Sequence, residues 1–308
     1  MFPLDEKQKQ EVLKLYYSLK KINSEYKIQN IKLRQNKSII ALIKNFWGRG
    51  GVETFKHLKL KFKSRKLPDE GVTTKYESIS ASPFLNERVA VYTSTFGGDF
   101  TILNPIFVPN NCDYFYIGDR EIPENSVWKQ LKFETIIPNY HSLTNIEKNR
   151  FVKMNPHKIF SNYKYSVYID GNVQLIGDPS EFINLIGTKG IALHNHRARN
   201  SAYDELEVIF SLNKINKNEY DSFYKVLQES SLPTDFGLAE CNVIARDHCN
   251  QISNKITEQW WELFYDLKLV RDQISFPIVV YKNDIEMKDI TTLGSNVYNN
   301  DILRIIVK

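Results

Sequence analysis

The stretch YSVYIDGN, residues 165–172, decides how the rest of the sequence is interpreted. An apolar run that is typical of a buried strand stops at Asp170, and Gly171 and Asn172 follow directly. Asp-Gly-Asn on its own is an ordinary turn sequence. Open α/β sheets bind their ligands at the carboxyl ends of the strands, so an acid in this position is expected to face a crevice.

The segments on either side alternate between predicted strands and predicted helices. Strands are predicted in RVAVYTSTF (88–96), CDYFYIGD (112–119), GIALHNHR (190–197) and ISFPIVVYK (274–282). Helices are predicted over 143–160, over Asn254–Leu269, and after the Asp178 cap, where Pro179 takes a first helical position. This alternation predicts an α/β fold with a mixed, mostly parallel, Rossmann-like sheet and helices on both faces.

Composition is that of an ordinary soluble globular protein, with 42% apolar and 25% charged residues in 308. Cys112, Cys241 and Cys249 match no metal-finger spacing and indicate thiols in a reducing compartment. The amino terminus has no signal-peptide pattern, and no apolar run is long enough to span a bilayer. We therefore expect a cytoplasmic protein, either free or peripheral on the inner face of a membrane.

The first 80 residues differ from the remainder. Residues 1–70 contain 17 Lys and Arg against 7 Asp and Glu, whereas the rest contains 24 and 29. We expect residues 1–80 to form a basic, mainly helical extension and residues 81–308 to form the main domain. The extension can bind an anionic membrane or a partner, or mediate homo-oligomers through its helix. Alternatively, its basic residues form a charged face that only contacts solvent. No nucleic-acid-binding motif accompanies the basic residues.

Several polar residues at predicted strand ends are candidates for chemistry. Asp170 and Asn172 lie two residues apart and can share one Mn²⁺ or Mg²⁺ ion that bridges a diphosphate. Arg150 and Lys153 share one face of a predicted helix and can stabilise charge on a leaving group, although such a pair is usually a solvated face. The other strand ends provide Thr93, Ser94 and Asp119, and His194, His196 and Arg197. The two histidines indicate either a polar pocket or structural packing.

From about Arg88 to Lys282 the sequence resembles the glycosyltransferase-like domain shared by plant mucilage-related proteins and bacterial polysaccharide-cluster proteins. The resemblance covers nearly two-thirds of the chain. It is carried by RVAVYTSTFGGDF, CDYFYIGD, Trp128, NRFVKMNPHKIF, YSVYIDGN, HNHR followed by AYDE, GLAECNVIAR, and WW ahead of RDQISF.

The resemblance implies a GT-A-like fold and a glycosyltransferase that moves a sugar from a nucleotide-diphosphate donor to a glycan or lipid-linked glycan acceptor in surface polysaccharide synthesis. Asp170-Gly171-Asn172 then looks like a variant Asp-x-Asp motif. Asn172 replaces the usual second acid, which leaves metal dependence open. The donor-binding residues would be Thr93, Ser94, Asp119, Arg150, Lys153, Asp170, Asn172, His194, His196, Arg197 and Gln273. A late histidine often supplies a further metal ligand, but none follows His248.

Two acids remain as candidates for the catalytic base. Asp272, in RDQISF, can take the proton of an acceptor hydroxyl, and Glu240 is the alternative base or an acceptor contact. Asp272 can equally be a helix cap or a salt-bridge partner. Trp260 and Trp261 can stack on sugars, although core packing is expected for at least one of them. Two other functions stay open: a hydrolase that uses the same acids and histidines, and a non-catalytic glycan-binding protein of the same fold.

Overall fold

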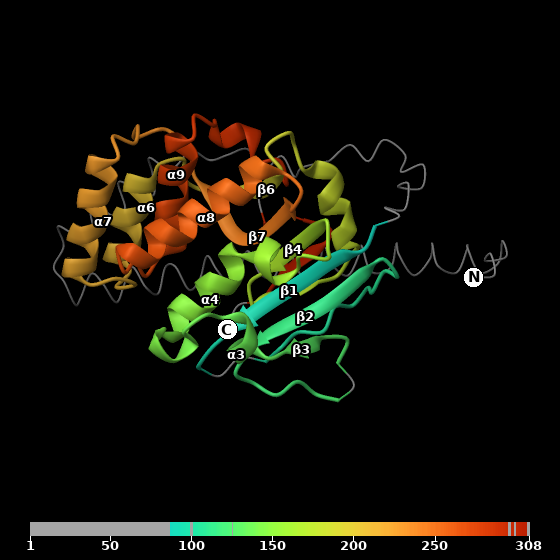
Figure 1. The fold of residues 1–308 in the computed structure, drawn as a ribbon. Helices are drawn as coiled ribbons and strands as arrows, with labels where there is room; N and C mark the ends of the chain where they lie inside the picture. The colour runs from blue at the N-terminus through green and yellow to red at the C-terminus, as the bar shows by residue number, and fades with distance from the viewer. Residues whose placement is uncertain (1–86, 99–100, 125, 295–296, 299, 307–308) are drawn as a thin grey trace.

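The computed structural model describes residues 87–98, 101–124, 126–294, 297–298 and 300–306, so the predictions for residues 1–80 lie outside the described residues. A six-stranded sheet with the order β3-β2-β1-β4-β7-β6 forms the centre of this part of the chain (Figure 1). Its strands are β1 (Val89–Thr95), β2 (Cys112–Gly118), β3 (Lys129–Leu131), β4 (Tyr165–Ile169), β6 (Ile191–Asn195) and β7 (Ala239–Asp247). Strands β5 (Val173–Leu175) and β8 (Leu303–Ile305) pair separately as a two-stranded ribbon.

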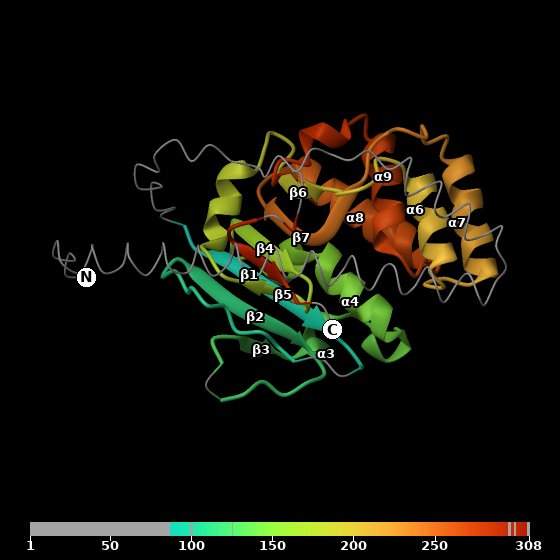
Figure 2. The same ribbon diagram turned by 180° about the vertical axis from the view of Figure 1, so that it is seen from behind.

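Five of the six strands run in the same direction. Strands β3, β2, β1 and β4 pair in parallel, and β7 is antiparallel to both β4 and β6. Every residue of β1 is buried, as expected for a strand that is covered on both faces. Figure 2 shows β1, β2 and β4 side by side from behind. The predicted α/β class with a mostly parallel sheet is confirmed.

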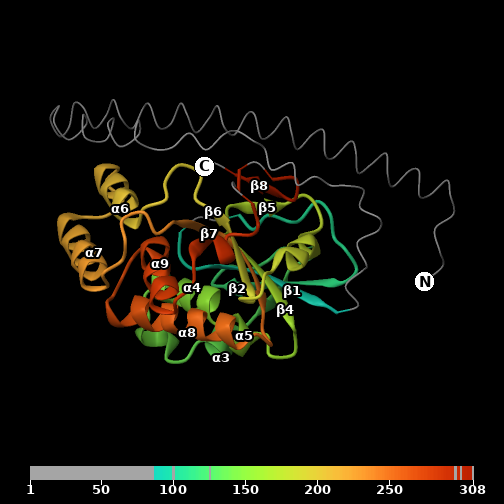
Figure 3. The same ribbon diagram turned by 90° about the horizontal axis from the view of Figure 1, so that it is seen from above.

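The two faces of the sheet are covered differently. Helices α4 (Asn145–Met154), α8 (Gln251–Asp266) and α9 (Asp272–Lys282) lie on one face, where α4 packs against β1 and α9 against β7. The 3₁₀ helix η2 (Pro179–Leu185) and the β5–β8 ribbon cover the other face (Figure 3). Helices on both faces are thus confirmed, but the helix predicted after Asp178 is of the 3₁₀ type. Asp178 caps it as expected, because its side chain accepts from the Ser180 backbone N–H.

The remaining helices are short or lie at the edge of the sheet. They are α3 (Phe133–Ile136), η1 (Tyr140–Ser142), α5 (Pro156–Ile159), α6 (Ala202–Ser211), α7 (Lys217–Glu229) and η3 (Met287–Asp289). Helices α6 and α7 pack on each other, and α6 also packs against α9. In the described part of the chain, no helix is both long and apolar enough to cross a membrane.

The prediction of a late strand over 274–282 is wrong, because this segment belongs to helix α9. Residues 274–280 are all buried, so the segment has no polar face. A short, continuously apolar and β-branched run has no periodicity that separates a buried helix from a buried strand. Trp260 of α8 packs against this helix and is fully buried, and its Nε1 donates to the Asp272 carbonyl at 3.1 Å. The expectation that at least one tryptophan belongs to the core is therefore confirmed.

Candidate functional site

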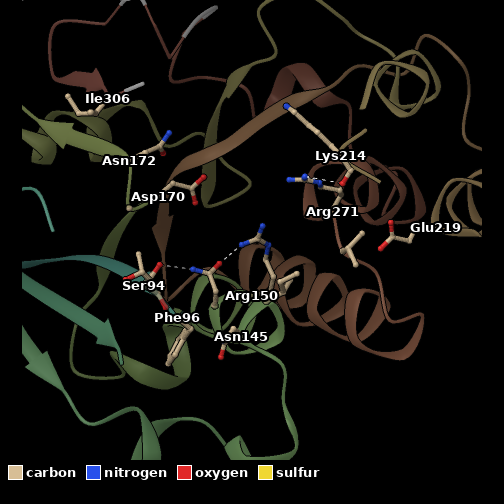
Figure 4. Close-up of a pocket in the computed structure, with 15 residues that line it drawn as sticks. Ser94, Phe96, Asn145, Arg150, Asp170, Asn172, Lys214, Glu219, Arg271 and Ile306 are labelled. Atoms are coloured by element: carbon tan, nitrogen blue, oxygen red, sulfur yellow. Dashed lines mark hydrogen bonds between the residues drawn. The ribbon is translucent and has the colours of Figure 1, made fainter. Parts of the chain in front are cut away.

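A cleft of about 580 Å³ opens at the carboxyl edge of the sheet, where β1 and β4 end. Figure 4 shows the side chains that line it, with Asp170 and Asn172 on one side and Arg150 below them. The lining residues are Ser94, Thr95, Phe96, Asn145, Ile146, Asn149, Arg150, Asp170, Gly171, Asn172, Lys214, Glu219, Val270, Arg271 and Ile306. We call this space the outer cleft. The acid after β4 faces a crevice, as the strand pattern predicts.

Hydrogen bonds and an ion pair hold both the backbone and the side chain of Asp170 in place. Its backbone N–H donates to the Asn242 carbonyl of β7 at 2.8 Å. The Tyr168 hydroxyl donates to Oδ1 at 2.8 Å, and Lys153 Nζ lies 3.5 Å from the same oxygen. About a third of the side chain (34%) stays exposed.

Gly171 allows a close approach between β4 and β1. A Cβ atom at this position would lie 2.5 Å from Thr95 Cγ2, closer than carbon atoms can approach. The middle position of the Asp-Gly-Asn motif is therefore restricted by packing against Thr95.

Helix α4 presents Arg150 and Lys153 from one face, as their spacing predicts. A capping box fixes the start of the helix, because Thr144 Oγ1 accepts from the Glu147 N–H and the Glu147 carboxylate accepts from the Thr144 N–H. Both cations reach the same carboxylate: Lys153 Nζ lies 2.6 Å from Asp272 Oδ2 and Arg150 Nη2 lies 3.2 Å from Oδ1.

The surroundings of Asp272 do not favour its predicted role as the base. Burial alone would raise the pKa of the Asp272 carboxyl, but the charges of Arg150 and Lys153 outweigh burial and hold that pKa below its ordinary value. Its side chain is only 8% exposed, and both oxygens contact a cation. A carboxylate held this firmly in its ionised form is a weak proton acceptor. The salt-bridge alternative is therefore the one that the structure shows.

A smaller space of about 180 Å³ continues inward from the outer cleft, and we call it the inner pocket. The two spaces share Arg150, Asp170, Lys214 and Arg271. The inner pocket is lined in addition by Lys153, Glu205, Ile209, Glu240, Cys241, Asn242, Asp272, Gln273 and Ile274. Because β7 is antiparallel, its first residues reach the edge of the sheet where β4 ends, which brings Glu240 to Asp170.

The polar groups of the inner pocket come from β7 and α9. Gln273 Nε2 donates to the Ala239 carbonyl at 2.9 Å, which fixes the start of α9 against β7. The Asn242 side-chain oxygen is buried without a hydrogen-bond partner among the described atoms. The Glu240 side chain is 12% exposed and lies 3.7 Å from His196 Nε2.

The two histidines at the end of β6, His194 and His196, are buried beside the site and do not line either space. For His194 the structure supports packing and not a polar pocket. His194 is fully buried, its ring packs edge-on to Phe182, and its Nε2 pairs with Asn300 at 3.1 Å. His196 Nδ1 accepts from the Arg199 backbone N–H at 3.0 Å. Burial lowers the pKa of both imidazoles to about 3, so both are uncharged at neutral pH. The Arg197 guanidinium lies 5.9 Å from the centre of the Tyr298 ring.

The other predicted donor contacts are spread around the edge of the sheet. Ser94 lines the outer cleft, and its carbonyl accepts from Asn149 Nδ2 at 2.6 Å. Thr93 lines a separate small void beside Trp128. Asp119 is exposed, and its carboxylate accepts from the Gly97 backbone N–H at 2.8 Å, which ties the ends of β1 and β2 together.

Sequence reasoning missed Lys214, Arg271, Asn149 and Glu219. Lys214 and Glu219 lie on either side of the start of α7, in a segment that no motif marks. Arg271 stands next to the predicted Asp272 and could have been noticed there. Asn149 lies one residue before Arg150 on the same helix.

The side chains around Asp170 do not fit the predicted Mn²⁺ or Mg²⁺ ion. Such ions prefer several charged oxygen ligands, but Asn172 is neutral and one oxygen of Asp170 already contacts Tyr168 and Lys153. Among the residues that the structure describes, no group of three or more His, Cys, Asp and Glu side chains could hold a metal.

Comparisons with known proteins agree with the resemblance seen in the sequence. A stretch of 142 residues, 41% of this chain, is 32% identical to the probable hexosyltransferase MUCI70 of Arabidopsis thaliana, and the match spans 23% of that protein. Mouse xyloside xylosyltransferase 1 superposes with a TM-score of 0.39 and 8% identity, over 64% of this chain and 82% of that chain. The bifunctional glycosyltransferase WbbM gives a TM-score of 0.41 and 12% identity, over 68% and 39%. These two structural similarities are distant.

The family model gives the broader match. The TOD1/MUCI70 glycosyltransferase-like domain matches residues 127–307, which is more than half of the chain. The match includes the strand that ends at Asp170, the cationic face of α4, and the start of α9 at Asp272. The chain therefore belongs to the TOD1/MUCI70 glycosyltransferase-like domain family.

Proposed function

We propose that this protein is a glycosyltransferase that moves a sugar from a nucleotide-diphosphate donor to a glycan acceptor in surface polysaccharide synthesis. The observation that carries the proposal is the position of Asp170 and Asn172, at the carboxyl end of β4, in a cleft whose outer part continues into a small polar pocket. Family membership supports the same class of reaction.

In this proposal the outer cleft holds the nucleotide and its diphosphate. The cleft combines cationic side chains with apolar ones at Phe96, Ile146 and Val270. Ile146 is 45% exposed on the first turn of α4, so it offers an apolar surface to a flat base or a ribose. The cations lie on the side nearer the inner pocket, where a diphosphate would join the transferred sugar.

The inner pocket holds the transferred sugar. Glu240, Asn242 and Gln273 provide oxygen and amide groups that can hydrogen-bond sugar hydroxyls. In the reaction the acceptor oxygen attacks the anomeric carbon, the bond from that carbon to the phosphate oxygen breaks, and its electron pair leaves with the diphosphate. The acceptor proton goes to Glu240, because Asp272 is occupied by two cations. Arg150 stabilises the charge that develops on the leaving phosphate.

Asp272 acts as a positioning residue in this scheme. Its two oxygens hold Arg150 and Lys153, and Lys153 in turn contacts Asp170. The same arrangement argues against Asp272 as the acid of a glycosidase. Glycosidases need one carboxylic acid whose pKa is raised enough to donate a proton, whereas the pKa of Asp272 is lowered.

The finer parts of the proposal concern residues 1–80 and the acceptor. We propose that residues 1–80 form the basic extension and that residues 81–308 form the catalytic domain. The extension would hold the enzyme on an anionic membrane surface, where a lipid-linked glycan acceptor lies. Its 17 basic residues within positions 1–70 support this proposal.

A thermal-shift panel of nucleoside diphosphates and nucleotide sugars tests the proposed function. At a ligand concentration of 100 Kd a true ligand stabilises the fold by about 2.7 kcal/mol, which raises the Tm by roughly 5–10 °C. Asp170→Ala should abolish sugar transfer while leaving the Tm of the ligand-free protein near its original value. Asp235→Ala, at an exposed position outside the lining of the cleft, is the matched control. If no nucleotide raises the Tm and no sugar is transferred, the protein is not a nucleotide-sugar transferase.

A further inference from the structure

Two cations at the cleft, Lys214 and Arg271, have no role in the scheme so far. Lys214 lies in the connection between α6 and α7, and Arg271 is the residue before α9. Both line the outer cleft as well as the inner pocket, so they stand at the junction of the two spaces. In the proposed function this junction is where the diphosphate lies.

The backbone around these two residues is fixed. Arg271 Nη2 donates to the Lys214 carbonyl at 3.3 Å, which links the two connections. The Lys214 backbone N–H donates to the Ile209 carbonyl at 2.9 Å, and the next residue, Ile215, is buried. The Lys214 residue itself is exposed at the cleft. A long cationic side chain therefore starts from an anchored position and lines both spaces.

Arg150 completes the cationic group from the other side. Its side chain is 18% exposed, and its Nε is buried without a hydrogen-bond partner among the described atoms. Figure 4 shows the nitrogen-bearing ends of Lys214, Arg271 and Arg150 around the space in front of the Asp170 carboxylate. Three cations from three separate segments of the chain thus surround one space.

Two acids at this space, Asp170 and Asp272, already contact a cation, and Glu219 of the outer cleft accepts from the Asn216 backbone N–H. Lys153 is almost completely buried, and it contacts Asp272 and Asp170 at once. The bond that Arg271 makes to Lys214 is to an uncharged carbonyl, so this bond does not neutralise the guanidinium charge. A divalent ion on Asp170 would lie next to Lys153 and Arg150, and like charges at such short range repel strongly. An anion would gain from the same cations.

We propose that Lys214 and Arg271, together with Arg150, bind the diphosphate of the donor directly, without a bridging divalent ion. The proposal rests on the proposed function, because it assigns part of the same cleft to the diphosphate. It gives Asp170 the task of fixing Lys153 and facing the sugar. Asn172, a neutral residue where an Asp-x-Asp motif has its second acid, agrees with a site that carries no metal charge.

Calorimetric titration of the full chain with UDP, GDP, ADP and CDP, in EDTA and again with Mn²⁺ or Mg²⁺, tests the proposal. The nucleotide that binds should do so with the same Kd in EDTA and in metal, within about twofold. Inorganic pyrophosphate should compete for the site in EDTA. Lys214→Ala and Arg271→Ala should each raise the Kd by roughly 10- to 100-fold, because each removes a charge-assisted contact.

The controls separate this proposal from the proposed function. Lys225→Ala removes an exposed lysine of α7 that pairs with Glu229 away from the cleft, and it should bind like the original chain. Binding that appears only with Mn²⁺ or Mg²⁺ overturns the metal-free site but leaves the transferase intact. Normal binding by both Lys214→Ala and Arg271→Ala overturns the assignment of these residues. If no nucleoside diphosphate binds to the folded protein in either condition, the proposed function itself fails.

Discussion

Replacing Lys153 by Met gives the sharpest test of the charge network behind the cleft. The side chain of Lys153 is 2% exposed and that of Asp272 is 8% exposed, so the pair is shielded from water. Met has a similar length but no charge. Of the two salt bridges that Asp272 makes, only the one to Arg150 would remain. Removal of one partner from a buried ion pair costs about 3–5 kcal/mol, so we expect a loss of about 3 kcal/mol or more.

Urea unfolding followed by tryptophan fluorescence measures this loss. The Trp260 Nε1 donates to the Asp272 carbonyl, so its emission reports on the start of α9. With a urea m value of about 3 kcal/mol/M, the midpoint should fall by about 1 M or more. Lys268→Met is the matched control: Lys268 is 64% exposed and pairs with Glu147, and its loss should cost less than about 1 kcal/mol.

Acid unfolding tests the same network independently. The folded-state pKa of Asp272 lies below its ordinary value, so the unfolded chain binds this proton first as the pH falls below about 4. The stability that the ion pairs contribute is therefore complete above about pH 4 and is lost as the pH falls toward the folded-state pKa. In Lys153→Met this loss should be smaller. Equal urea midpoints for Lys153→Met and Lys268→Met, with unchanged acid unfolding, would refute the reasoning.

Three further outcomes are expected. Glu240→Gln should lower turnover by a factor on the order of 10² or more with little change in donor Kd, as measured by steady-state kinetics. Asp272→Asn should weaken donor binding as well. If both variants keep near-normal turnover, the departing phosphate takes the proton. Gly171→Ala should lower both Tm and donor affinity, because its Cβ would clash with Thr95, and unchanged values in thermal shift would contradict the close packing. The full chain should float with anionic vesicles at low salt but not at high salt, since basic residues near such a surface contribute about 1 kcal/mol each, and a chain that starts at residue 81 should stay in solution; flotation of both chains would contradict a membrane role for residues 1–80.

The sequence predicts the parts of the site that depend on local pattern. Strand β4 stops at Asp170 as its apolar run indicates, and Arg150 and Lys153 share a helix face as their spacing indicates. The ion pair between Lys153 and Asp272 joins residues that are 119 positions apart, and no local pattern reveals such a contact. The pattern around Asp272 that suggested a base therefore gave no sign of the two cations that hold it. Lys214 was missed because an exposed lysine in a connection looks the same whether or not a cleft lies beside it.

The reversed direction of β7 has a consequence for how this protein can diversify. The connection from α7 leads directly into the first residues of β7, and these form a wall of the inner pocket. Strands β1 and β4, which end at the outer cleft, are reached through other connections. Insertions or substitutions between residues 230 and 238 can thus reshape one end of the ligand site while the other keeps its geometry. Under the proposed function, a library randomised there should yield variants that accept new sugars with the same nucleotide.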